Sequence, residues 1–267
     1  MILRLLLKQK KQACLDDLIS CKFNITANKK IFLIGDSHSA SLSFDLKNKI
    51  VEKKFQFISY FQRGCLYFPE FNLINKAGKV VRKCDDNYFQ KVKQTLLNEK
   101  NSIIIFGGRF PLYLTNNYFD NQEGAIEGGR WNNTYISVGK YNTIQTSFKN
   151  EILELSKNNK IILIYPIPEV GWNPNKQVYN QWVKRKFNKN FNLVNVTTSY
   201  KVYKDRTKSS FELLNSTKGD NIYRVYPHKL FCDTIIKDRC VTHDDKNVFY
   251  YDDDHISIKG AEMINDL

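Results

Sequence analysis

The sequence predicts a three-layer α/β/α domain built on a mostly parallel sheet. Short apolar runs, typical of buried strands, alternate with amphipathic stretches, typical of helices, and this order suits a parallel sheet with helices on both faces. The sequence has no repeat, and its 267 residues with 42% hydrophobic content suffice for a substantial core. We therefore expect one α/β domain over residues 29–267, preceded by an amino-terminal extension or linker over residues 1–28.

The alternation is clear in the first part of the chain. We expect strands at 29–35, 55–60 and 102–108, and helices at 39–54 and 85–100. In the first helix Leu42, Leu46 and Ile50 fall on one face, as an amphipathic helix requires. The second begins with aspartates and ends in lysine, which suits the two ends of a helix dipole.

Residues 111–140 interrupt this order with a polar stretch rich in Asn, Gly and Tyr, which predicts a long surface excursion or a small hairpin. Its aromatic residues either stack on sugar rings or clamp the loop: Tyr113, Tyr118, Trp131 and Tyr135. Beyond it we expect helices at 143–160, 175–190 and 207–217, and strands at 161–171, 221–227 and 247–251.

The chain is basic, with a formal net charge of +14. Such a balance invites a nucleic-acid interpretation. Lys and Arg are, however, spread along the whole chain rather than gathered in one arm or helix. We therefore expect either a plain solvated surface or weak attraction to anionic glycans and lipid headgroups, and no nucleic-acid partner.

No apolar run reaches the roughly 18 residues that a membrane-spanning helix needs. The start, "MILRLLLKQKKQ", is broken by Arg4 and lacks a small-residue cleavage site, so it does not match a secretion signal. We expect it to be the end of a preceding segment of a longer protein.

The six cysteines fall into three local pairs without C-x-x-C spacing, which speaks against zinc. We expect three disulfides and an oxidising compartment, with six reduced buried thiols as the alternative. The expected pairs are Cys14–Cys21, Cys65–Cys84 and Cys232–Cys240.

A polar cluster follows the first predicted strand in "IFLIGDSHSA". Ser37 stands where a strand meets a helix, and the N–H groups of a helix start can stabilise an oxyanion. A serine needs a base to become a nucleophile. The alternative is that Asp36 or Ser37 is only an N-cap. We expect His38 to pack beside this turn and not to act as a second base.

A candidate base lies in "YYDDDHISIKGAEMI" near the carboxyl end. Asp252 precedes His255 by three residues, and at that spacing a carboxylate can accept a hydrogen bond from the imidazole Nδ1–H and leave Nε2 for the serine proton. The alternatives are a cation site that includes Asp253 and Asp254, or a solvated acidic cap. Since a hard cation wants more oxygen ligands, we expect no metal and no cofactor.

These two blocks together resemble the SGNH (GDSL-type) hydrolases. The match is closer to the carboxyl-terminal SGNH domain of bacterial acyltransferase-three-type membrane O-acyltransferases, and it runs over about residues 14–264. The blocks that carry it are "LIGDSHSA", "RGCLYFP", "IIIFGGRF", "IYPIPEVG" and "CDTIIKDRCVTHDDKNVFYYDDDHISIKGA". The resemblance implies a short flavodoxin-like sheet.

The resemblance also implies roles for residues. Ser37 would be the nucleophile, His255 the general base and Asp252 the group that orients it, while the N–H groups of Ser37 and Gly64 would form the oxyanion hole. Where the family places an Asn, this chain has Arg109, which we expect to be the third polar group of the site. The alternative is that Arg109 forms a salt bridge that fixes the excursion.

The implied function is transfer of acetyl or another small acyl group onto a cell-envelope polysaccharide, such as lipopolysaccharide O-antigen or exopolysaccharide, through an acyl-serine. The alternatives are a carbohydrate O-acetyl esterase and an inert glycan-binding module. The resemblance implies an upstream membrane acyltransferase domain as acyl donor. It also implies a periplasmic or otherwise extracytoplasmic location, with the full-length protein tethered to the inner membrane and this chain not itself spanning it.

Overall fold

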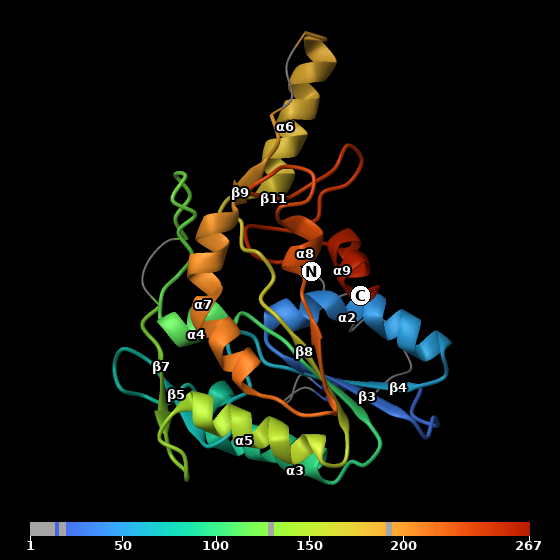
Figure 1. Cartoon of the computed structure of the whole chain (residues 1–267), viewed down its shortest axis with the longest axis vertical. Helices are drawn as coiled ribbons and strands as arrows, with labels where there is room; N and C mark the ends of the chain where they lie inside the picture. The colour runs from blue at the N-terminus through green and yellow to red at the C-terminus, as the bar shows by residue number, and fades with distance from the viewer. Residues whose placement is uncertain (1–13, 16–19, 128–130, 191–193) are drawn as a thin grey trace.

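A computed structural model describes residues 14–15, 20–127, 131–190 and 194–267 (Figure 1). Their main sheet has the strand order β1-β2-β4-β3-β6-β8-β10. The strands are β1 (Cys14–Leu15), β2 (Ser20–Phe23), β3 (Lys30–Gly35), β4 (Gln56–Phe61), β6 (Ile103–Phe106), β8 (Lys160–Ile164) and β10 (Ile222–Val225). From β4 to β10 every pairing is parallel, in the flavodoxin-like order. The predicted fold class is confirmed.

The sheet extends further towards the amino terminus than the apolar pattern indicated. Ser20–Phe23 lies within the expected extension but forms β2, which pairs antiparallel with β4 and with β1. The rest of residues 1–19, apart from the two residues of β1, lies outside the described residues.

Helices cover both faces of the sheet (Figure 1). They are α2 (Ser37–Glu52), α3 (Asp86–Leu97), α4 (Phe110–Thr115), α5 (Ile144–Ser156), α6 (Pro174–Phe187), α7 (Tyr200–Ser216), α8 (His228–Phe231) and α9 (Ile258–Asn265). Phe32 and Ile34 of β3 pack with α3 and α5, while Ile31 and Leu33 pack with α2 and α9. This alternation places one core on each face. Within the described segments, no helix combines the length and apolar character needed to cross a membrane.

Two small sheets and a short helix flank the main one. The excursion was expected to be a long surface segment or a small hairpin. Its strand β7 (Thr134–Ser137) pairs with the distant β5 (Phe71–Ile74), and an isolated antiparallel bridge joins Asp120 to Ile126. The strand β9 (Thr197–Ser199) pairs with β11 (Arg239–Val241), and a 3-10 helix, η1, spans Arg82–Cys84.

The predicted strand at 247–251 is wrong. Its residues form only isolated bridges, Val248 with His243 and Tyr250 with Ile256, because successive backbone groups bond to different segments. Several boundaries also differ. The helix α2 begins at Ser37 rather than residue 39, and the helix expected at 207–217 is the second half of α7. The strand expected at 161–171 ends at Ile164, and α3, α5 and α6 end three or four residues before their expected ends.

The two ends of the domain are joined by α2 and α9. The Asn265 side chain donates to the backbone oxygen of Leu42 and to Asp45, and Lys49 pairs with Asp45 and Asp266. Because α2 follows β3 and α9 follows the carboxyl-terminal Asp-x-x-His, this packing brings the two predicted motifs together.

Gly35 is needed because strands approach closely at this point. A Cβ here would lie 2.3 Å from the Gly107 backbone oxygen and from the Ser39 hydroxyl. We expect Gly35→Ala to lower the free energy of unfolding by about 2–3 kcal/mol, since overpacking forces the backbone apart. Urea denaturation measures this change.

Gly78→Ala is the matched control. Gly78 also has a positive φ, +71°, but has no neighbour within 4 Å of an added Cβ among the described residues. Gly78→Ala should lower the free energy of unfolding by only about 1 kcal/mol, because alanine is strained in the left-handed region. Equal losses in the two variants would contradict the close-approach explanation.

Candidate active site

The carboxyl end of β3 delivers the predicted nucleophile. β3 ends at Gly35, Asp36 caps α2, and Ser37 is the first residue of the helix. β6 is the neighbour across from β3 at the point where the strand order reverses, and such switch points are where open α/β sheets bind ligands. Ser37 therefore lies at this edge, at the positive end of α2.

Asp36 fixes this turn with a buried carboxylate. It accepts the backbone N–H of His38 at 2.9 Å, the backbone N–H of Arg109 at 2.9 Å and the Tyr113 hydroxyl at 3.0 Å. It thus caps α2 and also joins the β3–α2 turn to the segment that follows β6. Because Asp36 is the cap, the hydroxyl of Ser37 is left to bond elsewhere.

The structure brings Ser37, His255 and Asp252 together, and their catalytic roles stay a prediction. His255 Nε2 lies 2.9 Å from Ser37 Oγ, although the two residues are 218 positions apart. His255 Nδ1 lies 3.0 Å from each carboxylate oxygen of Asp252. With its proton on Nδ1, the imidazole presents a lone pair on Nε2 to the serine O–H. This is the geometry that proton abstraction from Ser37 requires.

The histidine is held by its own loop. Asp252 Oδ1 accepts the backbone N–H groups of Asp254 at 3.1 Å and His255 at 2.7 Å, which forms an Asx turn. The Tyr251 N–H closes the loop by donating to the His255 carbonyl at 2.8 Å. The same carboxylate therefore shapes the backbone and orients the ring.

A second carboxylate, that of Asp254, also reaches the histidine. Asp254 Oδ1 lies 2.6 Å from His255 Nδ1, and Oδ2 lies 2.8 Å from Arg109 Nη1 and 3.2 Å from His38 Nε2. From the sequence, Asp254 was expected only as part of a cation site or a solvated cap, so this contact was missed. Its position directly before His255 was the available signal. His38 is buried beside the turn, as expected.

Arg109 lies at the centre of a buried charge cluster, with its side chain only 8% exposed. Its Nε donates to Glu169 at 2.7 Å, and its terminal nitrogens contact Glu127 and Asp254. Arg206 contacts the other oxygen of Glu169 at 3.0 Å. Glu127 belongs to the excursion, so the salt bridge considered as the alternative is present. The oxyanion role of Arg109 stays a prediction.

The cluster makes His255 a strong base. Burial acts to lower the pKa of His255, but hydrogen bonds to Asp252 and Asp254 and their charges outweigh it and raise the pKa to about 10. Burial likewise opposes the charge of Asp254, but hydrogen bonds from both histidines and the charges of His38 and Arg109 hold the pKa of this carboxyl well below its usual range. The imidazole thus gains its proton affinity from two carboxylates.

The loop that carries Gly64 begins next to the nucleophile turn. Phe61 of β4 lies opposite Gly35, and the Gln62 N–H donates to the Gly35 carbonyl at 3.1 Å. Gly64 follows in the left-handed region, with φ +72°. That its N–H contributes to an oxyanion hole stays a prediction.

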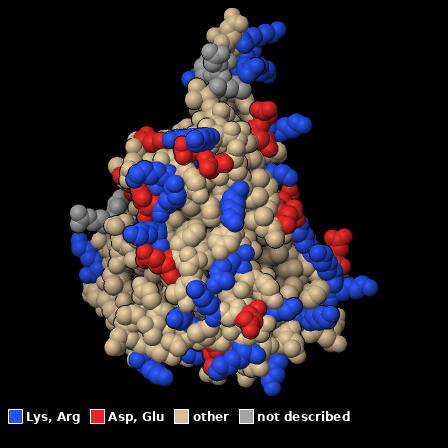
Figure 2. Space-filling view, viewed as in Figure 1, with Lys and Arg blue, Asp and Glu red and all other residues tan. Residues whose placement is uncertain are grey.

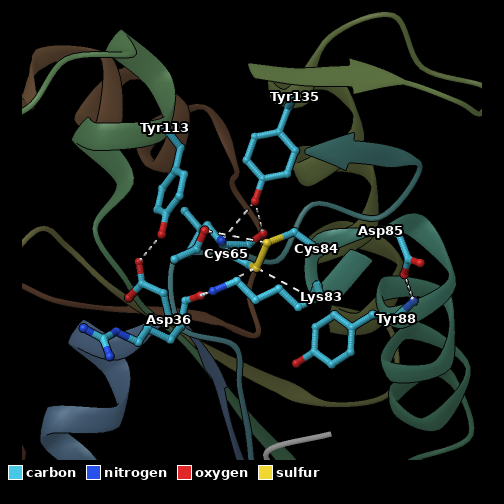
Figure 3. Close-up of a disulfide and its surroundings, with 11 residues drawn as sticks. Asp36, Cys65, Lys83, Cys84, Asp85, Tyr88, Tyr113 and Tyr135 are labelled. Carbon is cyan, nitrogen blue, oxygen red and sulfur yellow. Dashed lines mark hydrogen bonds between the residues drawn. A yellow bond between two sulfur atoms is a disulfide. The ribbon is translucent and has the colours of Figure 1, made fainter. Parts of the chain in front are cut away.

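A disulfide and an aromatic residue hold this loop in place (Figure 3). Cys65 is bonded to Cys84 at the end of η1. The Tyr135 hydroxyl donates to the Leu66 carbonyl at 2.9 Å and accepts the Leu66 N–H at 3.1 Å. Tyr113 and Tyr135 are both buried. Tyr135 therefore clamps this loop, Tyr113 holds the Asp36 turn, and neither forms an open sugar platform.

Two of the predicted disulfides are confirmed by the structure: Cys65–Cys84 and Cys232–Cys240. For the third pair, Cys21 is disulfide-bonded, and its backbone lies opposite that of Cys14 in the β1–β2 register. The side chain of Cys14 lies outside what the structure describes.

The acidic and imidazole groups here are close enough to consider a cation. His38, Asp254 and His255 form one such group, and Asp252, Asp253 and Asp254 form another. In the first group, however, Asp254 is already paired with Arg109, and His255 Nε2 faces Ser37. These contacts suit proton transfer better than metal binding.

Fold and site define an α/β domain with a serine, a histidine and a carboxylate at the switch point of a parallel sheet. A family model described as "SGNH domain (fused to AT3 domains)" matches residues 8–267, and the chain belongs to this family. The resemblance inferred from the motifs is thereby confirmed.

Among solved structures, the chain is similar to the periplasmic domain of a lipopolysaccharide acetyltransferase from Salmonella ser. Paratyphi A. That match has 15% identity and a TM-score of 0.57, and it covers 89% of this chain and 80% of that chain. A possible lipase from Chitinophaga pinensis DSM 2588 has 11% identity and a TM-score of 0.36 over 89% of this chain and 95% of that chain, too low to carry an argument. No curated protein matches. At these identities the first likeness supports the fold alone.

The double carboxylate predicts a pH effect. A general base acts only when unprotonated, so activity is lost as the pH falls through the pKa of His255, which Asp252 and Asp254 raise to about 10. We expect Asp254→Asn to lower this pKa and to move the acid limb of kcat/KM down by about one pH unit or more. A pH series with an aryl acetate substrate measures the shift.

Asp253→Asn supplies the matched control, because it makes the same chemical change one residue away. Asp253 is half-buried, and its carbonyl accepts N–H groups from Val170 and Gly171. The acid limb of kcat/KM for Asp253→Asn should stay within a few tenths of a pH unit of that of the unchanged protein. An equal shift in both variants would show a general charge effect and refute a specific role for Asp254.

Proposed function

We propose that this chain is a serine-dependent O-acyltransferase domain that moves acetyl or another small acyl group onto a cell-envelope polysaccharide, such as lipopolysaccharide O-antigen or exopolysaccharide. The observation that carries the proposal is the 2.9 Å contact between Ser37 Oγ and His255 Nε2, with Asp252 on the opposite ring nitrogen. Membership of the SGNH family supports acyl-transfer or ester-hydrolysis chemistry.

The mechanism follows from these contacts. His255 Nε2 takes the proton of Ser37 as Oγ bonds to the acyl carbon, and the negative charge passes to the acyl oxygen. The N–H groups of Ser37 and Gly64 stabilise this oxyanion beside the N-terminus of α2. As the tetrahedral state collapses, the leaving group receives the proton from His255. A sugar hydroxyl then gives its proton to His255 as its oxygen bonds to the acyl carbon of acyl-Ser37. The bond between Ser37 Oγ and the acyl carbon breaks, Oγ takes the proton back from His255, and the acylated glycan is released.

The acyl donor is an AT3 membrane domain joined to this one. The family consists of SGNH domains fused to AT3 domains, and the Salmonella neighbour is described as a periplasmic domain, which supports an extracytoplasmic site beside the inner membrane. The disulfides support an oxidising compartment. The proposed mechanism requires no cofactor.

One observation favours a second candidate, a carbohydrate O-acetyl esterase. The His255 side chain is 27% exposed, so water can reach the reacting atoms in the open site. Water as acceptor would use the same residues and release the acid. Acceptor competition separates the two: an oligosaccharide should divert acyl groups from water to sugar if transfer dominates.

We expect Ser37→Ala to lower the rate with an aryl acetate by at least about 1,000-fold, since the nucleophile is removed. Mass spectrometry of the parent should show one added acyl group on Ser37, which an acceptor oligosaccharide discharges. Ser39→Ala is the control, because its buried hydroxyl has no hydrogen-bond partner among the described residues. It should keep the parent's rate. Full activity or full cellular acetylation in Ser37→Ala would refute the enzyme and leave a glycan-binding module.

A further inference from the structure

One surface departs from the even spread of charge. Between Glu169 and Asp205 the sequence contains no Asp or Glu, so the expectation of evenly spread charge is wrong for this stretch. The cations within it are Lys176, Lys184, Arg185, Lys186, Lys189, Lys201 and Lys204. Those from 176 to 189 belong to α6 and the residues that follow it.

The helix α6 projects from the body of the molecule (Figure 1). Its only buried residues are Pro174 and Val178, at its base, and every residue beyond Val178 is at least partly exposed. At about 1.5 Å per residue, Phe187 lies roughly 18 Å along the helix from Asn175. The outer half of this helix is therefore not stabilised by packing against the core.

The outer half carries aromatic rings among its cations. Phe187 is 83% exposed, the highest value for a large apolar side chain in the described residues, and Trp182 is 40% exposed. Tyr179, Trp182 and Lys186 share one helix face, at spacings of three and four. Figure 2 shows the Lys and Arg side chains gathered around this tip. Exposed rings beside cations are characteristic of segments that lie in a membrane interface.

We propose that the outer part of this arm, residues 182–190, binds the surface of a bilayer that contains anionic lipid. The ring of Phe187, at the end of the helix, enters the boundary between headgroups and acyl chains. Trp182 lies five residues earlier, about 140° around the helix. Its ring lies at the level of the headgroups, where Arg185, Lys186 and Lys189 meet the lipid phosphates. A polyanionic glycan would satisfy the cations, but it offers no apolar layer for a ring as exposed as Phe187. The lipid surface is therefore the partner that fits both features.

The base of the arm is fixed to the candidate active site. Asn175 Nδ2 donates to the carbonyls of Tyr250 at 2.7 Å and Tyr251 at 2.8 Å, and Tyr251 directly precedes Asp252. A bound tip would hold the loop of His255 within roughly 20 Å of the lipid surface. The proposal does not depend on the reaction at Ser37, so Ser37→Ala should bind vesicles as well as the parent does.

Co-sedimentation of the chain with vesicles tests the proposal. We expect binding to phosphatidylcholine vesicles that contain phosphatidylglycerol, little binding to phosphatidylcholine alone, and release by high salt. The triple variant Arg185→Glu, Lys186→Glu, Lys189→Glu should weaken binding on the order of 100-fold. The matched control Lys76→Glu, Lys79→Glu, Arg82→Glu makes the same charge change on exposed residues elsewhere and should bind nearly as well as the parent.

A second pair of variants tests the apolar contact. Phe187→Ser should weaken binding about tenfold without altering its salt dependence. Ile235→Ser, at a position that is 72% exposed, should have no effect. Trp182 fluorescence should shift to the blue with anionic vesicles, and the shift should be absent in Trp182→Phe.

Two results would overturn the proposal. Equal weakening by the two charge-reversal variants would mean that overall charge, not the arm, attracts the vesicles. Absence of vesicle binding, combined with arm-dependent binding to an anionic polysaccharide such as heparin, would assign the arm to a glycan. Circular dichroism of each variant excludes misfolding as the cause.

Discussion

The candidate site depends on one buried cation. Arg109 draws carboxylates from three separate segments onto a single guanidinium: Glu127 from the excursion, Glu169 from the residues after β8 and Asp254 from the histidine loop. Burying these charges is costly, and removing one partner of such a cluster costs about 3–5 kcal/mol because the others stay behind uncompensated. The positions of the three segments are therefore mutually dependent, and Arg109, together with His38, holds Asp254 beside His255.

This arrangement gives the histidine an unusual pair of partners. Asp252 is supplied by the local turn and would orient the ring in any case, whereas Asp254 adds a second negative charge at the same nitrogen. Two carboxylates so close to each other repel, and Arg109 and His38 reduce that repulsion by binding Asp254. The result is a more basic imidazole, which gains proton affinity but is protonated over a wider range of pH. The charge on Arg109 thus influences how far the two carboxylates raise the pKa of His255.

The sequence revealed those parts of the fold and site that have a local cause. The apolar runs predicted the parallel strands, and the Asp-x-x-His turn positions its own histidine through hydrogen bonds three residues apart. Asp254 was missed because its role depends on Arg109, which the fold brings next to it from β6. The strand at 247–251 was predicted from β-forming residues, but tertiary hydrogen bonds divide that segment among several partners. Local patterns cannot show contacts that only the folded sheet creates.

The buried charge cluster around Arg109 and the base of α6 both contact the loop that carries His255. On one side Arg109 holds Asp254, and on the other Asn175 at the base of α6 holds the carbonyls just before Asp252. The loop between them is short and closed by its own Asx turn, so it cannot move far without breaking one of these contacts. A force on the arm would therefore be transmitted to His255, the proposed general base, rather than absorbed by a flexible linker. Fixing the arm at a surface would accordingly fix the orientation of the reacting atoms relative to that surface.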